Sequence, residues 1–134
     1  MDDAYQAVLA ANQRFYQAFN EGDMPGMEAV WSRDLPVQCI HPGWDPVLGR
    51  EAVLESWRDI FDHATGATLA PREERVLLQG EAAMVLTFEQ IGDQPLIATN
   101  LFAREAGEWR MTHHHAGPCR SVPPSPGGAP SRLQ

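Results

Sequence analysis

The sequence lacks the features that would direct a protein to a membrane or to nucleic acid. No apolar run approaches the roughly 18 residues that a membrane-spanning helix needs. The first residues, MDDAYQ, have neither the basic flank nor the apolar stretch of a signal peptide. Ten basic residues stand against 18 acidic ones, giving a net charge of −8, whereas nucleic-acid phosphates require a basic surface. We therefore expect neither a membrane nor a nucleic-acid partner.

Cysteine is also scarce, and its pattern is not that of a metal site. The two cysteines, Cys39 and Cys119, show no metal-ligand spacing. We expect two free thiols in a cytoplasmic protein, with a structural disulfide as the alternative. Internal repeats are absent as well. The 134 residues are enough for one domain with a core of its own.

The order of the periodic segments predicts an α+β fold. Apolar residues at helical spacing predict three helices, over about residues 2–20, 24–31 and 50–61. Gly22 is the predicted end of the first helix, and Asp23 is the predicted N-cap of the second. Strand-like segments then alternate with glycine-containing turns, at residues 67–79, 82–91, 95–105 and 108–116. Helices followed by hairpins indicate an antiparallel sheet with helices on one face.

A short strand ending at His41 connects the second and third helices. Pro42 and Gly43 break this strand, because proline cannot donate to a ladder and glycine accepts a positive φ. Alternation along the strand places His41 on one face with Val37 and Cys39. The histidine is therefore predicted to face the third helix, and this is where we expect a pocket mouth.

The last segment differs in composition from the rest. Five prolines occur from Pro118 onward, with almost no apolar periodicity. We divide the chain into a domain at residues 1–118 and a Pro/Gly-rich mobile tail at residues 119–134. A proline-rich ligand for a partner domain is the alternative interpretation of the tail.

Four stretches together resemble the nuclear transport factor 2-like superfamily, and within it the SnoaL-like group. They are FYQAFNEGDMPGMEAVW, VQCIHPGW, GREAVLESW and EWRMTHHHAGP, in this order, within about residues 4–118. The resemblance implies a cone-shaped fold, in which a curved antiparallel sheet and three helices enclose a pocket. It also implies a homodimer through the convex face of the sheet.

Three relatives within the superfamily bear on chemistry. In ketosteroid isomerase the catalytic base matches His41, the oxyanion-hole tyrosine matches Phe15, and the protonated aspartic acid matches Asn100. SnoaL-like cyclases use a His and Asp pair, of which this chain keeps the histidine. The association domain of calmodulin-dependent protein kinases ends in a pattern similar to Trp109, His113, His115 and Gly117. The resemblance thus implies either acid–base chemistry or assembly.

His41, Asn100 and His114 are the catalytic candidates. His41 titrates near neutral pH and suits a general base, and Asn100 offers an amide donor to a ligand oxygen. Matching the last strand to the relatives turns His114 inward and His113 and His115 outward. Adjacent strand residues alternate in direction, so we expect no metal on the three histidines; pairing of His41 with His114 stays open, without an obvious carboxylate. No cofactor is expected.

The candidate ligand-binding residues are mostly aromatic and would suit a small apolar ligand, although an ordinary core has the same composition. Trp44 is either a lid or a plug over the cone. The same matching predicts that Val85, Leu101, Trp109 and Met111 point outward and form the dimer face. The expected lining is Phe15, Trp31, Trp44, Trp57, Phe61, Leu86, Phe88 and Phe102, with Met84 and Gln90 also inward.

Two functions follow from these observations. The first is a small-molecule-binding protein with cofactor-independent proton transfer, as in an isomerase, cyclase or hydratase, acting on an apolar metabolite that bears oxygen. The second is a non-catalytic ligand-binding or assembly module. A filled cone would favour the second.

Overall fold

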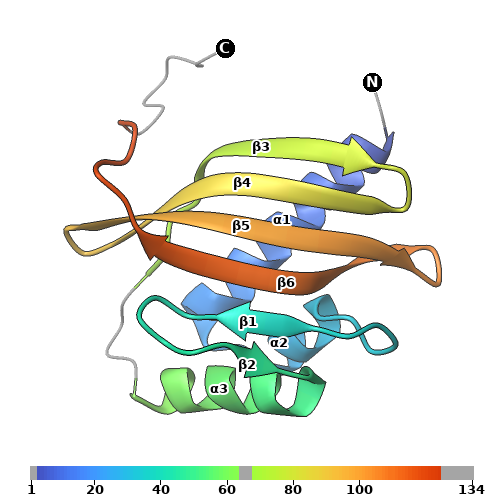
Figure 1. Cartoon of the computed structure of the whole chain (residues 1–134), viewed down its shortest axis with the longest axis horizontal. Coiled ribbons are helices and arrows are strands. Elements are labelled where there is room, and N and C mark those ends of the chain that lie inside the picture. Colours follow the sequence, from blue (N-terminus) through green and yellow to red (C-terminus); the bar gives the residue numbers. More distant parts are fainter. Residues whose placement is uncertain (1–2, 64–67, 125–134) are drawn as a thin grey trace.

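The computed structural model describes residues 3–63 and 68–124, and it confirms the predicted α+β architecture (Figure 1). Helix α1 passes behind the sheet, and α3 lies beside its short β2 end. The helices are α1 (Asp3–Glu21), α2 (Met24–Val30) and α3 (Arg50–His63). The strands are β1 (Gln38–Ile40), β2 (Val47–Leu48), β3 (Arg72–Gln79), β4 (Ala82–Ile91), β5 (Gln94–Glu105) and β6 (Glu108–Pro118).

The sheet is mixed, whereas the sequence predicted an antiparallel one. Its strand order is β2-β1-β6-β5-β4-β3, and β1 runs parallel to β6 while the other neighbours are antiparallel. The parallel pair joins the first and last strands in the sequence, and no local pattern specifies such a contact. Strand β2 was not predicted, because two residues are too few to show a period.

The helix ends follow the predicted signals. Gly22 has a φ of 62° immediately after α1, the left-handed conformation that commonly ends a helix. Asp23 caps α2 by accepting a hydrogen bond from the backbone N–H of Gly26 at 3.1 Å. Asn20 makes two hydrogen bonds, of 2.9 and 2.7 Å, to the backbone of Leu69, which fixes the chain where it enters the sheet. The predicted start of that strand at residue 67 lies outside the described residues.

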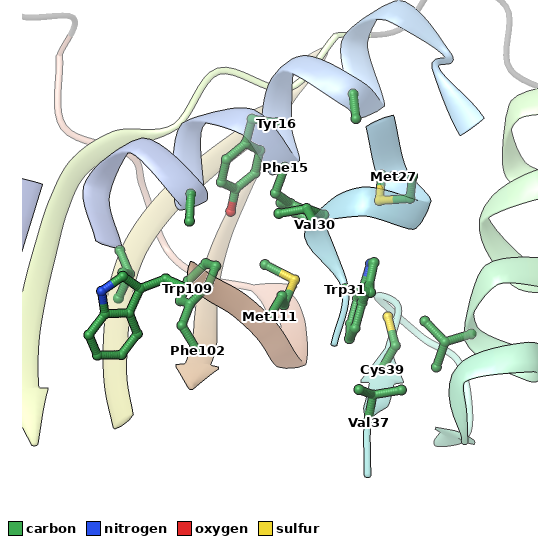
Figure 2. Close-up of a cluster of buried hydrophobic side chains, with 14 of the residues drawn as sticks. Phe15, Tyr16, Met27, Val30, Trp31, Val37, Cys39, Phe102, Trp109 and Met111 are labelled. Atoms are coloured by element: carbon green, nitrogen blue, oxygen red, sulfur yellow. The ribbon is translucent and has the colours of Figure 1, made fainter. Parts of the chain in front are cut away.

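The core lies between α1 and the face of the sheet that we call the inner face. Phe15 and Tyr16 extend from α1 toward Phe102 and Met111 on the strands (Figure 2). Trp31 follows α2 directly and forms a β-bridge to Met111, which ties the helical layer to β6. These side chains are almost completely removed from water, so they supply much of the hydrophobic stabilisation.

Strand β4 has the opposite orientation to the predicted one. Val85 pairs with Asn100 and is fully buried, whereas Leu86 and Phe88 point to the other face, which we call the outer face. The prediction was wrong because both faces of β4 carry apolar residues, and the inner face also bears Glu89. Hydrophobic alternation therefore could not set the direction of this strand.

A β-bulge changes the facing of residues along β6. Leu101 pairs with His113 and Phe102 with Met111, so Thr112 is an extra residue. Before the bulge Trp109 and Met111 face inward, and after it His114 and Ala116 do. The predicted inward direction of His114 is confirmed, while the outward direction of Trp109 and Met111 is wrong.

The outer face remains apolar, although with other residues than those predicted. Val85, Trp109 and Met111 are buried inside, and only Leu101 of the predicted set points outward. Three further apolar side chains, those of Met84, Leu86 and Phe88, share this face with Leu77. No described helix covers them, since α1 packs against the inner face.

The first residues after Pro118 contact the domain. The backbone N–H of Cys119 donates to the carbonyl of Pro95 at 3.0 Å, and Arg72 donates to the carbonyl of Pro123 at 3.2 Å. The rest of the predicted tail, residues 125–134, lies outside the described residues. None of the described helices is long and apolar enough to span a membrane.

Candidate functional site

His41 lies buried at the end of β1, with 3% of its surface exposed, on the predicted face with Val37 and Cys39. Its Nε2 is 2.9 Å from the hydroxyl of Ser56 on α3, and that hydroxyl donates to the carbonyl of Val53 at 2.7 Å. Because serine has one hydroxyl hydrogen, His41 must donate from Nε2. This tautomer leaves Nδ1 as the acceptor, with the sulfur of Cys39 at 3.8 Å as its nearby partner.

The surroundings keep His41 uncharged at neutral pH. Burial lowers the pKa of this imidazole from 6.5 to about 4, since desolvation penalises the charged form. Burial, together with the charge of Glu89, raises the pKa of the neighbouring Cys39 thiol, which therefore stays protonated. His41 is thus a neutral acceptor. The predicted titration near neutral pH is wrong, because burial makes this imidazole a weaker base. Cys39 is not a thiolate nucleophile.

Two tryptophans enclose the His41 ring. Trp57 from α3 and Trp44 from the loop both contact it edge-on, with ring centroids 4.6 Å away in each case. Trp44 is 45% exposed and Trp57 only 2%, so Trp44 covers the histidine from outside instead of filling the cone. The indole N–H of Trp57 is buried and has no hydrogen-bond partner among the described residues.

His114 approaches the same aromatic group from β6. Its ring lies 4.8 Å from Phe15 and 5.9 Å from Trp57, measured between centroids. Burial, with smaller effects from the other histidines, lowers its pKa from 6.5 to about 3. We call His41, His114, Trp57, Phe15 and Trp44 the inner cluster. Its two imidazoles are both neutral at pH 7.

A line of buried polar side chains continues from His114 along the inner face. His114 Nδ1 is 2.6 Å from Asn100 Oδ1, and Asn100 Nδ2 donates to the hydroxyl of Tyr16 at 3.1 Å. Tyr16 donates to Glu89 Oε2 at 2.5 Å. Asn100 Nδ2 also donates to Asn12 at 2.8 Å. Both amide hydrogens of Asn100 are therefore engaged within the protein, so Asn100 contacts His114 directly and presents no spare donor.

Glu89 is the carboxyl group at the end of this line. Burial raises its pKa from 4.5 to about 7, and the hydrogen bond from Tyr16 counteracts part of that rise. Burial and the nearby Glu89 charge in turn raise the pKa of Tyr16 well above its usual value. Tyr16 is thus a phenol at all ordinary pH values, while Glu89 changes charge near neutrality.

The structure brings some of the predicted site residues together and separates others. Phe15, Trp57, His41 and His114 come together, Phe61 packs at the edge of Trp57, and Trp31 and Phe102 are core residues nearby. Leu86 and Phe88, expected in the lining, lie on the outer face. Asn12, Tyr16, Ser56 and Glu89 were missed. The available signal was their polarity within apolar runs, such as Glu89 within VLTFEQI.

Other site types have little support in the described part of the chain. Residues 3–63 and 68–124 contain no group of three or more His, Cys, Asp or Glu side chains that could hold a metal ion. Lysine is absent from the whole sequence, so an imine with a lysine side chain is excluded. One surface hollow, of about 320 Å³, lies between α1, α2 and the start of β6, and another, of about 210 Å³, lies between α1 and the turn from β5 to β6. No histidine lines either hollow.

Comparison with known proteins agrees with this architecture. The model of the SnoaL-like domain matches residues 8–120. The chain belongs to this family. Among solved structures, a candidate dehydratase of the NTF2-like family from Streptomyces avermitilis superposes with a TM-score of 0.82 at 28% identity, covering 88% of this chain and 97% of that one.

Two further relatives differ in the functions that their names state. A candidate association domain of calcium/calmodulin-dependent protein kinase type II from Thiobacillus denitrificans has 34% identity and a TM-score of 0.75, covering 83% of this SnoaL-like chain and 94% of its own. The F-box protein SKIP8 of Arabidopsis thaliana is 25% identical over 113 residues, which are 83% of this chain and 49% of that protein. The chain spans about half the length of this curated relative.

Proposed function

We propose that this SnoaL-like protein binds a small apolar metabolite bearing oxygen at the inner cluster and catalyses proton transfer there, without a cofactor. The supporting observation is the pair of neutral imidazoles, His41 and His114, which both pack near the buried indole of Trp57. Neutral imidazoles can accept a proton, and apolar walls strengthen the electrostatic interactions made inside.

In this proposal His41 is the general base. Its Nδ1 is the acceptor, and the half-exposed Trp44 covers the ring from the solvent side. The Trp57 indole N–H, which lacks a partner among the described residues, stabilises negative charge as it develops on the ligand oxygen. Such a pair suits an isomerase, cyclase or dehydratase step, because each begins with removal of a proton next to a carbonyl group. The name of the Streptomyces relative is consistent with this class.

The test uses His41 variants in a hydrogen–deuterium exchange assay on a neutral cyclic ketone such as cyclohexanone, followed by NMR in deuterated buffer. His41→Gln keeps a group that can hydrogen-bond to Ser56 but cannot take a proton, and His41→Ala removes both. We expect both variants to lose about 10²-fold or more of the catalysed exchange while staying folded. His63→Gln, on the exposed end of α3, is the matched control and should behave as the wild type.

Full exchange activity in His41→Gln, or unfolding of His41→Ala, would make His41 a structural residue. Absence of exchange in the wild-type protein would favour the second function, a non-catalytic ligand-binding or assembly module. The specific observation for that alternative is the 34% identity to the candidate kinase association domain, combined with the uncovered apolar outer face.

We further propose that the protein is a homodimer through the outer face and acts in the cytoplasm. Leu77 and Leu101 are 51% and 36% exposed on this face, beside the half-buried Phe88, and burying them against a second copy would remove apolar area from water. The two free cysteines support a reducing compartment.

Light scattering at micromolar concentration tests the dimer. Leu101→Glu should convert a dimer mass to a monomer mass, because a charge would be buried at the centre of the interface. Leu35→Glu changes an equally exposed leucine in a loop and should leave the mass unchanged. A monomer mass for the wild type would refute the proposal.

A further inference from the structure

The buried line from His114 to Glu89 crosses four elements and is nearly dry. It connects β6, β5, α1 and β4 through His114, Asn100, Tyr16 and Glu89, and the most exposed of these residues shows 2% of its surface. Burying a carboxyl group costs free energy, which an apolar residue in the same place would avoid. Stability alone therefore does not account for this arrangement.

Carboxylates at two ends fix the direction of every hydrogen bond in the line. An ionised carboxylate only accepts, so the Tyr16 hydroxyl donates to Glu89. The oxygen of that hydroxyl must therefore accept from Asn100 Nδ2. A branch of the line runs from Asn100 through Asn12 to Glu74 and gives the same result. Asn12 Nδ2 donates to Glu74, so Asn12 Oδ1 must accept from Asn100 Nδ2. Asn100 thus turns Oδ1 to His114, and His114 must carry its hydrogen on Nδ1.

The fixed tautomer leaves one atom of His114 without a role in the fold. Nε2 is the acceptor nitrogen, on the side of the ring away from Asn100, and no described residue hydrogen-bonds to it. The ring itself packs against Phe15 and Trp57 within the inner cluster. Which nitrogen of a histidine is protonated depends on the bond made by the other one, so control lies with the buried line.

We propose that Glu89, acting through Tyr16 and Asn100, is the positioning residue that holds His114 in its Nδ1–H tautomer and so presents Nε2 as a second acceptor to the ligand. Only the last part, the encounter with a ligand, rests on the proposed function. The ligand class follows from the two acceptors: a neutral molecule with an O–H donor fits, and a carboxylate does not. Among the residues described, the buried set contains no arginine.

The charge of Glu89 makes this control dependent on pH. When Glu89 takes up a proton, Tyr16 loses its ionised acceptor and its hydroxyl can reverse. The branch through Asn12 to Glu74 alone then holds the Asn100 amide, so the preference of His114 for the Nδ1–H tautomer weakens. The titratable groups around the line are Tyr16 on α1, Glu74 on β3, Cys39 and His41 at β1, and His114 itself. His114 has a pKa of about 3 and stays neutral, so a change near pH 7 would report on Glu89, whose pKa is about 7.

Nitrogen-15 NMR of labelled histidine tests the proposal without any ligand, because the two ring nitrogens have different shifts when protonated and unprotonated. The wild type should show His114 protonated at Nδ1 above pH 8, with a tautomer shift on acidification that has its midpoint near pH 7. Glu89→Gln is uncharged at every pH, like the protonated carboxyl group. It should therefore lose the pH step and show at pH 8 the tautomer mixture that the wild type reaches below pH 7. Tyr16→Phe should give a mixture of tautomers at every pH.

The matched controls are Glu81→Gln on an exposed turn and Tyr5→Phe, which changes a half-buried tyrosine in the first turn of α1. Both should reproduce the wild-type titration. An Nε2–H tautomer in the wild type at pH 8, or a pH step that survives in Glu89→Gln, would overturn the proposal. The wild-type titration alone suffices if Tyr16→Phe fails to fold. A correct tautomer with no ketone exchange would instead count against the proposed function.

Discussion

The two faces of the sheet reverse the usual distribution of polar and apolar side chains. The inner face, covered by α1, buries Glu89, Asn100 and His114 among its apolar residues. The outer face, which no described helix covers, exposes Leu77 and Leu101. A stable monomer needs neither feature, because buried polar groups and exposed apolar patches both cost free energy. The contrast supports the two proposals, chemistry at the inner face and partner contact at the outer face.

The strongest test of this contrast removes one phenylalanine from each face. Phe102→Ala on the inner face should lower the free energy of unfolding by about 3–5 kcal/mol, since the ring is fully buried and would leave a cavity. Phe88→Ala on the outer face should cost the isolated chain about 1 kcal/mol or less, and should weaken self-association instead. Urea unfolding of both variants provides the measurement. Equal losses in the free energy of unfolding for the two variants would show that the Phe88 ring belongs to the hydrophobic core.

The buried polar groups of the inner face should make stability depend on pH. His41 and His114 have pKa values of about 4 and about 3 when folded, below 6.5, so their contribution is complete above pH 6.5 and is lost as the pH falls toward those values. Each histidine should lower the free energy of unfolding by about 2 kcal/mol at pH 5 relative to pH 7. Glu89 acts oppositely, because its pKa is raised to about 7 and its burial penalty disappears between pH 7 and 4.5.

Denaturant unfolding at pH 7 and pH 5 measures the balance. The wild type should lose about 2 kcal/mol, since two histidines outweigh one carboxyl group. Glu89→Gln removes the compensating group, so its loss over the same interval should be larger, about 4 kcal/mol. A smaller loss in Glu89→Gln than in the wild type would contradict the raised pKa of this carboxyl.

The smallest effect concerns a region that belongs to neither face. Deleting all residues after Pro118 removes the bonds of Cys119 to Pro95 and of Arg72 to Pro123, each worth about 1 kcal/mol. The melting temperature should therefore fall by only a few degrees. A second deletion after Pro124 keeps both bonds and is the control. Loss of folding in the first deletion alone would mean that residues 119–124 belong to the domain.

The sequence by itself determined the helices, the longer strands and their order. Helical spacing, the Asp23 cap and the Gly22 stop are local signals, and they predicted α1, α2 and α3 to within two or three residues. His41 was found for the same reason, because strand alternation and the Pro42-Gly43 break act over a few residues. The turns that connect the hairpin strands were predicted from equally local signals.

Only the tertiary structure decided which way β4 and the first half of β6 face, and hence which polar residues meet. Both faces of β4 are apolar, and the bulge at Thr112 reverses the pattern within one strand. The line from His114 to Glu89 joins residues from α1, β4, β5 and β6 that no local period relates. Side-chain direction alternates at every strand residue, so one unforeseen extra residue turns a predicted outer surface into core.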